Sequence, residues 1–222
     1  MSRLFSLSEI DAVCRKAARG AGYGWGMAEE AGRSARWLAA YGFQGPEALA
    51  AWLRTLQPEA SLHRPSLQEG IWRAQRNICP LSAGTLASDY ESKLFSGETF
   101  EFEQVQQPIL MLSMVARIVE NRECSLIFSL NDHDIVCVAQ KIMFSSDFPW
   151  ETSCADVSVY LTDFETASKQ ETVEPSAQSR VVDEAAYETL LELAHRTYAP
   201  ATEASRIAGA GASASAGTTD ND

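Results

Sequence analysis

Residues 20–26 read GAGYGWG, with a glycine at every second position. Glycine accepts positive φ and lets two backbones approach closely, so such a run interrupts regular structure. Helix-like patterns precede and follow it. The segment therefore predicts a tight connector between two N-terminal helices. Tyr23 and Trp25 would lie at that junction, facing either the core or the solvent.

The connector belongs to a predicted unit of three helices. Small side chains dominate the second helix, so we expect the first helix to pack against its Ala31 and Ala35. Glu29 is expected to pair with Arg33, four residues later. Cap residues and glycines set the predicted boundaries. The first predicted helix, 7–19, is capped by Ser6 or Ser8 and ends at Gly20. The second, 27–41, ends at Gly42. The third, 45–57, begins with Gly45 and Pro46.

The remainder of the chain changes from helical to strand-like patterns. Residues 58–98 give the weakest signal, with one short helix predicted at 71–77. Beyond them, period-two alternation predicts strands, and an apolar run opened by Pro108 predicts a buried helix. The predicted elements are a strand at 99–103, the buried helix at 109–119, a hairpin of 124–130 and 135–143 with a four-residue loop at 131–134, a strand at 157–161 and a last helix at 183–198.

These elements predict an α+β fold in which the N-terminal three-helix unit packs on a small, mostly antiparallel sheet. After Pro200 the chain is mostly Ala, Gly, Ser and Thr, which cannot bury enough surface to fold. The predicted organisation is a single domain at 1–165 (helical unit 1–57, sheet with one buried helix 99–165), a polar linker and C-terminal helix at 166–198, and a disordered tail at 199–222.

Composition excludes several classes of function. The net charge of −12 is uneven: residues 1–57 hold seven Lys and Arg against five Asp and Glu, so the remainder carries −14. A strongly acidic body repels a phosphate backbone, which argues against nucleic acid as a partner. No apolar run approaches the roughly 20 residues that cross a bilayer. The N-terminus does not read as a signal peptide, so a cytoplasmic protein is expected.

The five cysteines are scattered and odd in number, and none forms a close pair. This pattern favours buried, reduced thiols over a disulfide framework or a zinc knuckle. No cofactor is predicted.

Residues 17–32, AARGAGYGWGMAEEAG, resemble a known bacterial family, and 36–38, 79–84 and the apolar run after Pro108 fit it as well. The chain is similar to an uncharacterised domain-of-unknown-function family of proteobacterial proteins. The resemblance is expected to extend over residues 5–165. It implies a bacterial protein and brings no activity with it.

The connector is the main candidate site. Uncovered backbone amides before a helix can cradle an anion, and the two aromatic rings could stack on a flat ligand. A dinucleotide loop is disfavoured, because the spacing is not G-x-G-x-x-G, a helix precedes it, and Glu29 and Glu30 would oppose an anion. A plain connector, a ligand- or partner-binding surface and a phosphate loop stay open as alternatives. The candidate residues are Arg19, Gly22, Tyr23, Trp25, Gly26 and Glu29.

Other chemical groups give weaker signals. The hairpin residues Asp132, His133 and Asp134 are more typical of a loop than of a metal site. Glu29 and Glu30 point about 100° apart on a helix and do not converge as an acid–base pair. Cys79 and His63 are the nearest cysteine and histidine that folding could join into a nucleophilic pair.

Without a converging catalytic set, the sequence favours a non-catalytic binding or accessory protein that docks a protein partner through its N-terminal helices. The alternative is a small-molecule metabolic enzyme with a pocket between helices and sheet, and DNA binding is a distant third. The sequence leaves the oligomeric state open.

Overall fold

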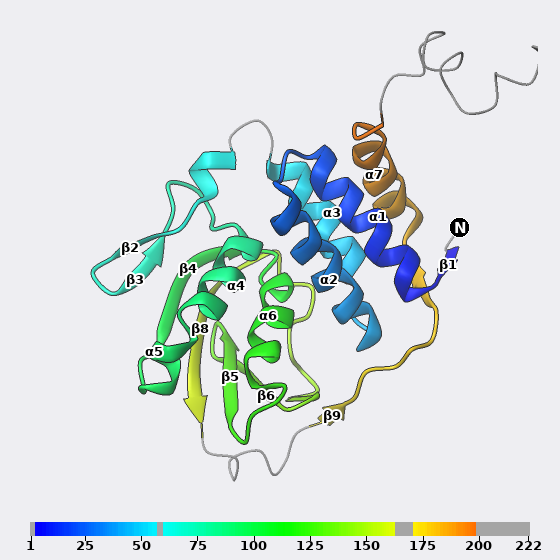
Figure 1. Ribbon diagram of the computed structural model, residues 1–222. Coiled ribbons are helices and arrows are strands. Elements are labelled where there is room, and N and C mark those ends of the chain that lie inside the picture. The colour runs from blue at the N-terminus through cyan, green and yellow to red at the C-terminus, as the bar shows by residue number, and fades with distance from the viewer. Residues whose placement is uncertain (1–2, 57–59, 163–170, 199–222) are drawn as a thin grey trace, which may run out of the picture.

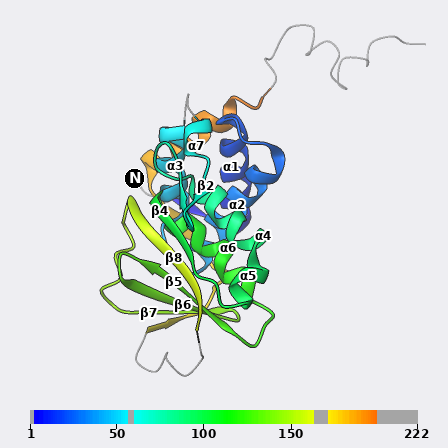
Figure 2. The ribbon, with the colours of Figure 1, turned by 90° about the vertical axis from the view of Figure 1, so that its left-hand side faces the viewer.

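The computed structural model describes residues 3–56, 60–162 and 171–198, so the predicted tail lies outside the described residues. Two layers make up the molecule (Figure 1). One is a group of helices near the N-terminus. The other is a mixed sheet covered on one face by helices, which confirms the α+β class. Figure 2 shows α4, α5 and α6 against the sheet, and α1, α2, α3 and α7 gathered at one end of it.

The N-terminal helices form because their caps and apolar faces agree. Ser6 caps α1 in a capping box: its Oγ accepts from the Glu9 amide, and the Glu9 carboxylate accepts from the Ser6 amide. The C-terminal helix packs against α1 and α3, with Asp183 as its cap. The predicted division into a domain and an appended helix stays a prediction. The bounds are α1 Leu7–Gly20, α2 Trp25–Ala40, α3 Gly45–Leu56 and α7 Glu184–His195.

Two glycines let these helices approach closely. A Cβ on Gly32 would lie 2.6 Å from the Asp11 carboxylate, so α1 packs closely on α2 at Gly32, beside the predicted alanine strip. A Cβ on Gly45 would lie 2.4 Å from the Ala35 carbonyl oxygen. The start of α3 therefore packs on Ala35, the surface that we had predicted for α1.

The prediction of a helix at 71–77 is wrong. Glu69 and Gly70 both take positive φ, 52° and 87°, and turn the chain into a hairpin of two short strands. The second strand then pairs in parallel with β4, so that its backbone groups are bonded to the sheet. The elements of this region are η1 Ala60–His63, β2 Ser66–Gln68, β3 Ile71–Arg73, α4 Pro80–Asp89 and α5 Glu91–Phe95.

The main sheet has the strand order β2-β3-β4-β8-β5-β6-β7-β9, and every neighbouring pair except β3–β4 is antiparallel. A separate antiparallel pair joins the N-terminus to the segment before α7. The bounds of the strands are β1 Arg3–Phe5, β4 Phe100–Gln106, β5 Ser125–Leu130, β6 His133–Val138, β7 Lys141–Phe144, β8 Cys154–Thr162, β9 Glu171–Val173 and β10 Arg180–Val182.

The predicted hairpin is present with two corrections. Its loop has two residues rather than four: Asn131 and Asp132 take φ of 43° and 71°, and His133 already pairs with Leu130. Asn and Asp tolerate positive φ better than most residues, which permits this tight turn. The predicted strand 135–143 is two strands, because the chain reverses at Ala139 (φ 46°) and β7 folds back on β6.

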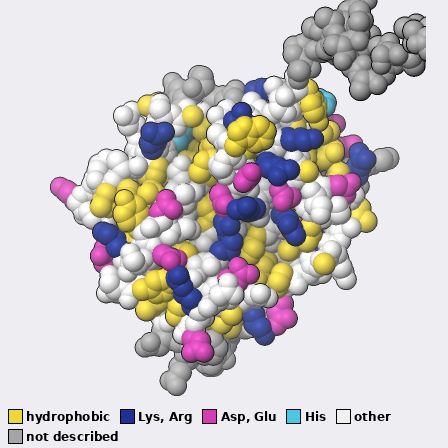
Figure 3. Space-filling model, in the orientation of Figure 1, with side chains coloured by type: hydrophobic (Ala, Val, Ile, Leu, Met, Phe, Trp, Pro, Cys, Tyr) yellow, Lys and Arg dark blue, Asp and Glu magenta, His cyan; other side chains and the backbone are white. Residues whose placement is uncertain are grey.

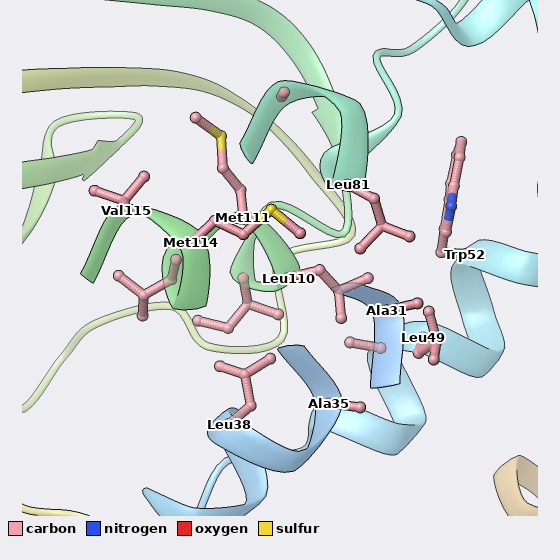
Figure 4. Packing of buried hydrophobic residues seen from close by; sticks show 14 of the residues in the cluster. Ala31, Ala35, Leu38, Leu49, Trp52, Leu81, Leu110, Met111, Met114 and Val115 are labelled. Carbon is pink, nitrogen blue, oxygen red and sulfur yellow. The ribbon is translucent and has the colours of Figure 1, made fainter. Parts of the chain in front are cut away.

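The predicted buried helix is α6, Ile109–Val119, and it lies at the centre of the molecule. It contacts the helices α2, α3 and α4 as well as the strands β5 and β6. Figure 4 shows Leu110 and Met111 of α6 in this packing, close to Ala31 and Leu81. The N-terminal helices therefore reach the sheet largely through α6.

The segment between β9 and β10, residues 174–179, crosses the C-terminal end of α2, and we call it the strap. The Ser176 amide donates to the Ala40 carbonyl at 2.8 Å. The Arg180 guanidinium donates to the Ala39 and Ala40 carbonyls at 2.7 and 3.1 Å. A cation at the carbonyl end of a helix also interacts favourably with the helix dipole.

Candidate functional site

The glycine-alternating segment forms a connector of four residues, because α1 ends at Gly20 and α2 begins at Trp25, two residues before the predicted start. A Cβ on Gly20 would lie 1.7 Å from the Leu193 carbonyl oxygen of α7, so glycine is required where the two backbones meet. Gly22 takes φ of 105°. Gly24 and Gly26 have neither a close backbone neighbour nor a positive φ, and a Cβ on either would meet nothing within 4 Å. Two of the four glycines are therefore explained by the fold.

Tyr23 points into the molecule. Its hydroxyl accepts a hydrogen bond from Trp52 Nε1 at 2.7 Å and lies 3.1 Å from the Cys79 sulfur. Burial raises the pKa of the phenol, and the neighbouring thiol raises it further. The side chain thus ties the connector to α3 and to the start of α4, and its role is structural.

Trp25 points outward. Its side chain is 67% exposed, and the guanidinium of Arg19 lies over its ring, 4.5 Å from the centroid. Arg19 also donates to the Tyr23 carbonyl, which fixes the guanidinium beside the ring. The two aromatic residues of the connector are therefore divided: one is part of the core, and the other offers a surface.

Trp25 borders a cleft between α1, the start of α2 and the turn after α7, which we call the Trp25 cleft. Its volume is about 680 Å³. On its border, Lys16 Nζ lies 5.5 Å from the centre of the Tyr198 ring and 3.5 Å from its hydroxyl. Figure 3 shows Lys and Arg side chains gathered over α1 and α2. The lining residues are Arg15, Lys16, Arg19, Gly20, Trp25, Glu29, Arg196, Thr197 and Tyr198.

The Trp25 cleft joins three of the six predicted site residues: Arg19, Trp25 and Glu29. Tyr23 turns inward, while Gly22 and Gly26 are exposed but do not line the cleft. Residues 196–198, which follow α7, could not be predicted as part of this site, since no local pattern places them beside α1. Arg15 and Lys16 carried a weak signal, because they stand off the apolar face of the first helix.

Glu29 and Glu30 diverge as expected. Glu29 faces the Trp25 cleft, whereas Glu30 forms ion pairs with Arg117 of α6 and, at 2.8 Å, with Arg33. The predicted Glu29–Arg33 pair is wrong, because Glu30 is held by Arg117 within reach of Arg33. Partial burial alone would raise the pKa of Glu30, but the hydrogen bond and charge of Arg117, together with Arg33, outweigh it and lower that pKa.

Folding does bring Cys79 and His63 together, through the Cys79 amide, which donates to the His63 carbonyl at 2.9 Å. Both residues are buried. The imidazole Nδ1 faces the Asn77 carbonyl at 2.6 Å, and the thiol caps α4 by accepting from the Ser82 amide at 3.4 Å. The thiol thus contributes to the N-terminal cap of α4, and the ring packs beside it, with its buried Nε2 unpaired among the described residues.

In the described part of the chain, no group of three or more His, Cys, Asp or Glu side chains is arranged to hold a metal ion. Asp132 forms the hairpin turn, and the His133 ring stands edge-on to Phe148, with centroids 6.4 Å apart. Within the same residues, no helix combines the length and apolarity needed to span a bilayer. All five cysteines are free thiols.

A second hollow lies between α1, α2, α6 and the strap, and we call it the Trp37 pocket. Its volume is about 450 Å³. Three arginines and several apolar side chains surround it, and no carboxylate, imidazole or thiol is among them. The lining residues are Leu7, Arg33, Arg36, Trp37, Ala40, Arg117, Pro175, Ser176 and Ala177.

The fold defines an α+β protein, and arginines line both of its hollows. Residues 5–88, from the end of β1 into α4, match the model of a family described as "Protein of unknown function (DUF3726)". The resemblance to a domain of unknown function is thereby confirmed over these residues, and its extension to residue 165 stays a prediction.

Two further comparisons add little. None of the curated proteins matches the chain. Among solved structures, malate dehydrogenase from Entamoeba histolytica is similar at 13% identity and a TM-score of 0.44, over 70% of this chain and 49% of that one. The chain thus spans about half the length of that protein. A TM-score of this size carries no functional argument.

Proposed function

We propose that this protein is a non-catalytic binding or accessory protein that docks a protein partner through its N-terminal helical unit, at the Trp25 cleft. The observation that carries the proposal is the exposed Trp25 ring with Arg19 held over it, at the edge of a hollow of about 680 Å³. Tryptophan and arginine are both enriched among the residues that contribute most of the binding energy at protein interfaces.

The charge of the cleft favours an acidic segment as the partner surface. The lining holds the cations Arg15, Lys16, Arg19 and Arg196 and one carboxylate, Glu29; Arg196 is paired with Glu192 at 3.3 Å, so the excess of positive charge comes from α1. This surface belongs to a chain of net charge −12, so it is a local exception to an acidic molecule. Complementary charge steers encounter and fixes orientation, while the indole ring would provide most of the affinity.

The groups that could perform chemistry have structural roles, which supports binding over catalysis. Tyr23, Cys79 and His63 are engaged in core hydrogen bonds away from the cleft. Two further expectations belong to the same proposal: a bacterial origin, which rests on the family resemblance, and a cytoplasmic location, which rests on the N-terminal sequence and is favoured by the free thiols.

Affinity capture tests the proposal with wild type and a Trp25→Ala variant. We expect Trp25→Ala to weaken retention of the specific partner about tenfold or more, since it removes the exposed anchor. Leu67→Ala is the matched control, because Leu67 is also exposed (52%) but lies on β2, in a different part of the chain. Identical partners with identical yields from wild type and Trp25→Ala would overturn the proposal.

Retention on heparin separates a protein partner from nucleic acid. We expect the protein to elute at low salt, because its acidic body repels a polyanion. Strong retention that is lost on adding salt, together with capture of nucleic acid by the wild type, would favour a phosphate backbone as the ligand and contradict the proposal.

The second candidate function is a small-molecule enzyme using a pocket between helices and sheet. The Trp37 pocket favours it by position, since α6 connects that pocket to the sheet. Its lining offers arginines and an aromatic ring but no carboxylate, imidazole or thiol, so binding is better supported there than proton transfer.

A further inference from the structure

The Trp37 pocket has the size and the rigid walls of a ligand site. Its volume of about 450 Å³ falls within the range of small-molecule pockets. The Trp37 ring is half-buried and packs against Tyr41, with centroids 4.1 Å apart. The opposite wall is the strap, which the Ser176 amide anchors to the Ala40 carbonyl. Both walls are therefore fixed by contacts within the chain.

The charges around the pocket are not balanced. Glu30 is shared between Arg117 and Arg33, so one carboxylate faces two guanidinium groups. Arg36 has a carboxylate neighbour in Asp11, but the closest nitrogen–oxygen distance is 3.9 Å, which is too long for a hydrogen bond. Three arginines and two carboxylates leave one positive charge.

Arg36 is the group best placed to receive an anion. Among the described residues, the Asp11 pair is its single ion pair, and its side chain is half exposed at the border of the pocket. A guanidinium presents several N–H donors in a plane that matches a carboxylate. The donors of Arg36 point to a carboxylate-bearing ligand, because no hydrogen bond to Asp11 engages them.

We propose that the Trp37 pocket binds a small monocarboxylate with a flat or compact apolar body. The carboxylate would lie on Arg36, with Arg33 nearby, and the apolar body against Trp37, Leu7 and Pro175. A single negative charge matches the one uncompensated positive charge. The limited volume and the strap across one side favour a small molecule over a peptide.

This site is separate from the Trp25 cleft, and the two have no lining residue in common. Failure of one proposal therefore leaves the other standing. Trp25→Ala should leave binding at the Trp37 pocket unchanged, and Arg36→Gln should leave capture of the partner unchanged.

The test is a titration of the full chain with phenylacetate, indole-3-acetate and hexanoate, followed by NMR of the Trp37 indole and Arg36 Nε–H groups. We expect at least one acid to shift both signals at concentrations on the order of millimolar. Phenylacetamide, which is nearly isosteric with phenylacetate but neutral, should bind at least about fivefold more weakly than the acid.

Variants locate the site. Arg36→Gln should weaken binding of the same acid about fivefold to tenfold, because it removes the charged partner but keeps a polar side chain. Arg64→Gln, a change at another exposed arginine, should have no effect. An unchanged thermal midpoint for Arg36→Gln would show that the fold is intact.

Three results would each overturn the assignment: no shift at Trp37 with any of the three acids, equal binding of phenylacetate and phenylacetamide, or equal binding by wild type and Arg36→Gln.

Discussion

The Tyr23 hydroxyl links three segments that are far apart in the sequence. It accepts the indole hydrogen of Trp52 at 2.7 Å and faces the Cys79 thiol at 3.1 Å. Trp52 is fully buried, so removing the hydroxyl leaves its Nε1–H without a partner in the core. An unsatisfied buried donor costs about 1–3 kcal/mol.

Tyr23→Phe should therefore lower the free energy of unfolding by about 1–3 kcal/mol. Trp25→Ala, two residues away, should change it by less than about 0.5 kcal/mol, because the side chain is exposed. Chemical denaturation of the two variants measures both. Equal losses of stability would mean that Tyr23 and Trp25 are not divided between core and surface.

Buried thiols and phenols make the molecule sensitive to alkaline pH. Burial raises the pKa of Cys137 from 9.0 to about 12, and burial, with nearby Cys137 and acidic groups, raises the pKa of Tyr41 from 10.0 to about 12. In both cases the fold favours the neutral form. The contribution of these two groups to the free energy of unfolding is fully present below their pKa values in the unfolded chain. It is lost as the pH rises toward their pKa values in the folded protein.

We expect the free energy of unfolding to fall progressively between about pH 9 and pH 12. In Cys137→Ala, which has no group to ionise there, the slope over this range should be smaller, although the variant is less stable at pH 7 because of the cavity. Denaturation at several pH values gives the slopes. Parallel curves for wild type and variant would contradict the assignment to Cys137.

At the scale of elements, the contact between α1 and α7 depends on Gly20. A Cβ there would lie 1.7 Å from the Leu193 carbonyl oxygen, and neither backbone can move away without separating the helices. Gly26 offers a matched comparison, since a Cβ there meets nothing within 4 Å and the residue is already helical.

Gly20→Ala should destabilise the fold by about 3 kcal/mol, the upper part of the range for overpacking. Gly26→Ala should be neutral or stabilising by up to about 1 kcal/mol. Thermal and denaturant unfolding distinguish them. If Gly20→Ala were as stable as Gly26→Ala, α7 would not be packed on α1 as described.

The elements that the sequence predicts well are those whose signals are local. The cap at Ser6, the apolar periodicity of α3 and the long apolar run of α6 each appear within one turn or one face. The errors have a different origin. Ala139 and Glu69 take positive φ, which neither residue type favours, so nothing in the local sequence announces a chain reversal there.

In the candidate site, too, residues with local sequence signals are predictable and residues placed by tertiary contacts are not. The connector and the candidates Arg19, Trp25 and Glu29 are predictable, because their signals lie within ten residues of each other. The inward turn of Tyr23 is not, since Trp52 and Cys79 are its partners through tertiary folding. The contribution of Tyr198 to the cleft likewise depends on the packing of α7 on α1, which no pattern in either helix specifies.

At the scale of the whole molecule, charge is segregated. Residues 1–57 carry +2 and the remainder −14, and three of the four cations that line the Trp25 cleft belong to the basic part. The acidic partner that we propose would thus be repelled by the acidic part of the molecule and attracted by the cleft. Such an arrangement orients the partner during approach, and its effect is expressed in the association rate and screened by salt.

Reversing the charge of the cleft should therefore slow association without unfolding the protein. Arg15→Glu combined with Lys16→Glu, both at exposed positions on α1, should lower the association rate constant of the captured partner about tenfold at low salt. Near 0.5 M salt the rate constants of wild type and variant should differ severalfold less than at low salt, because salt screens charges across distances as large as the cleft.

Arg64→Glu is the control: it changes an exposed arginine outside the cleft lining and should have a much smaller effect on the association rate constant. Stopped-flow mixing at several salt concentrations measures all three proteins. A faster dissociation with unchanged association, or equal slowing of association by Arg64→Glu, would show that the cleft does not steer its partner.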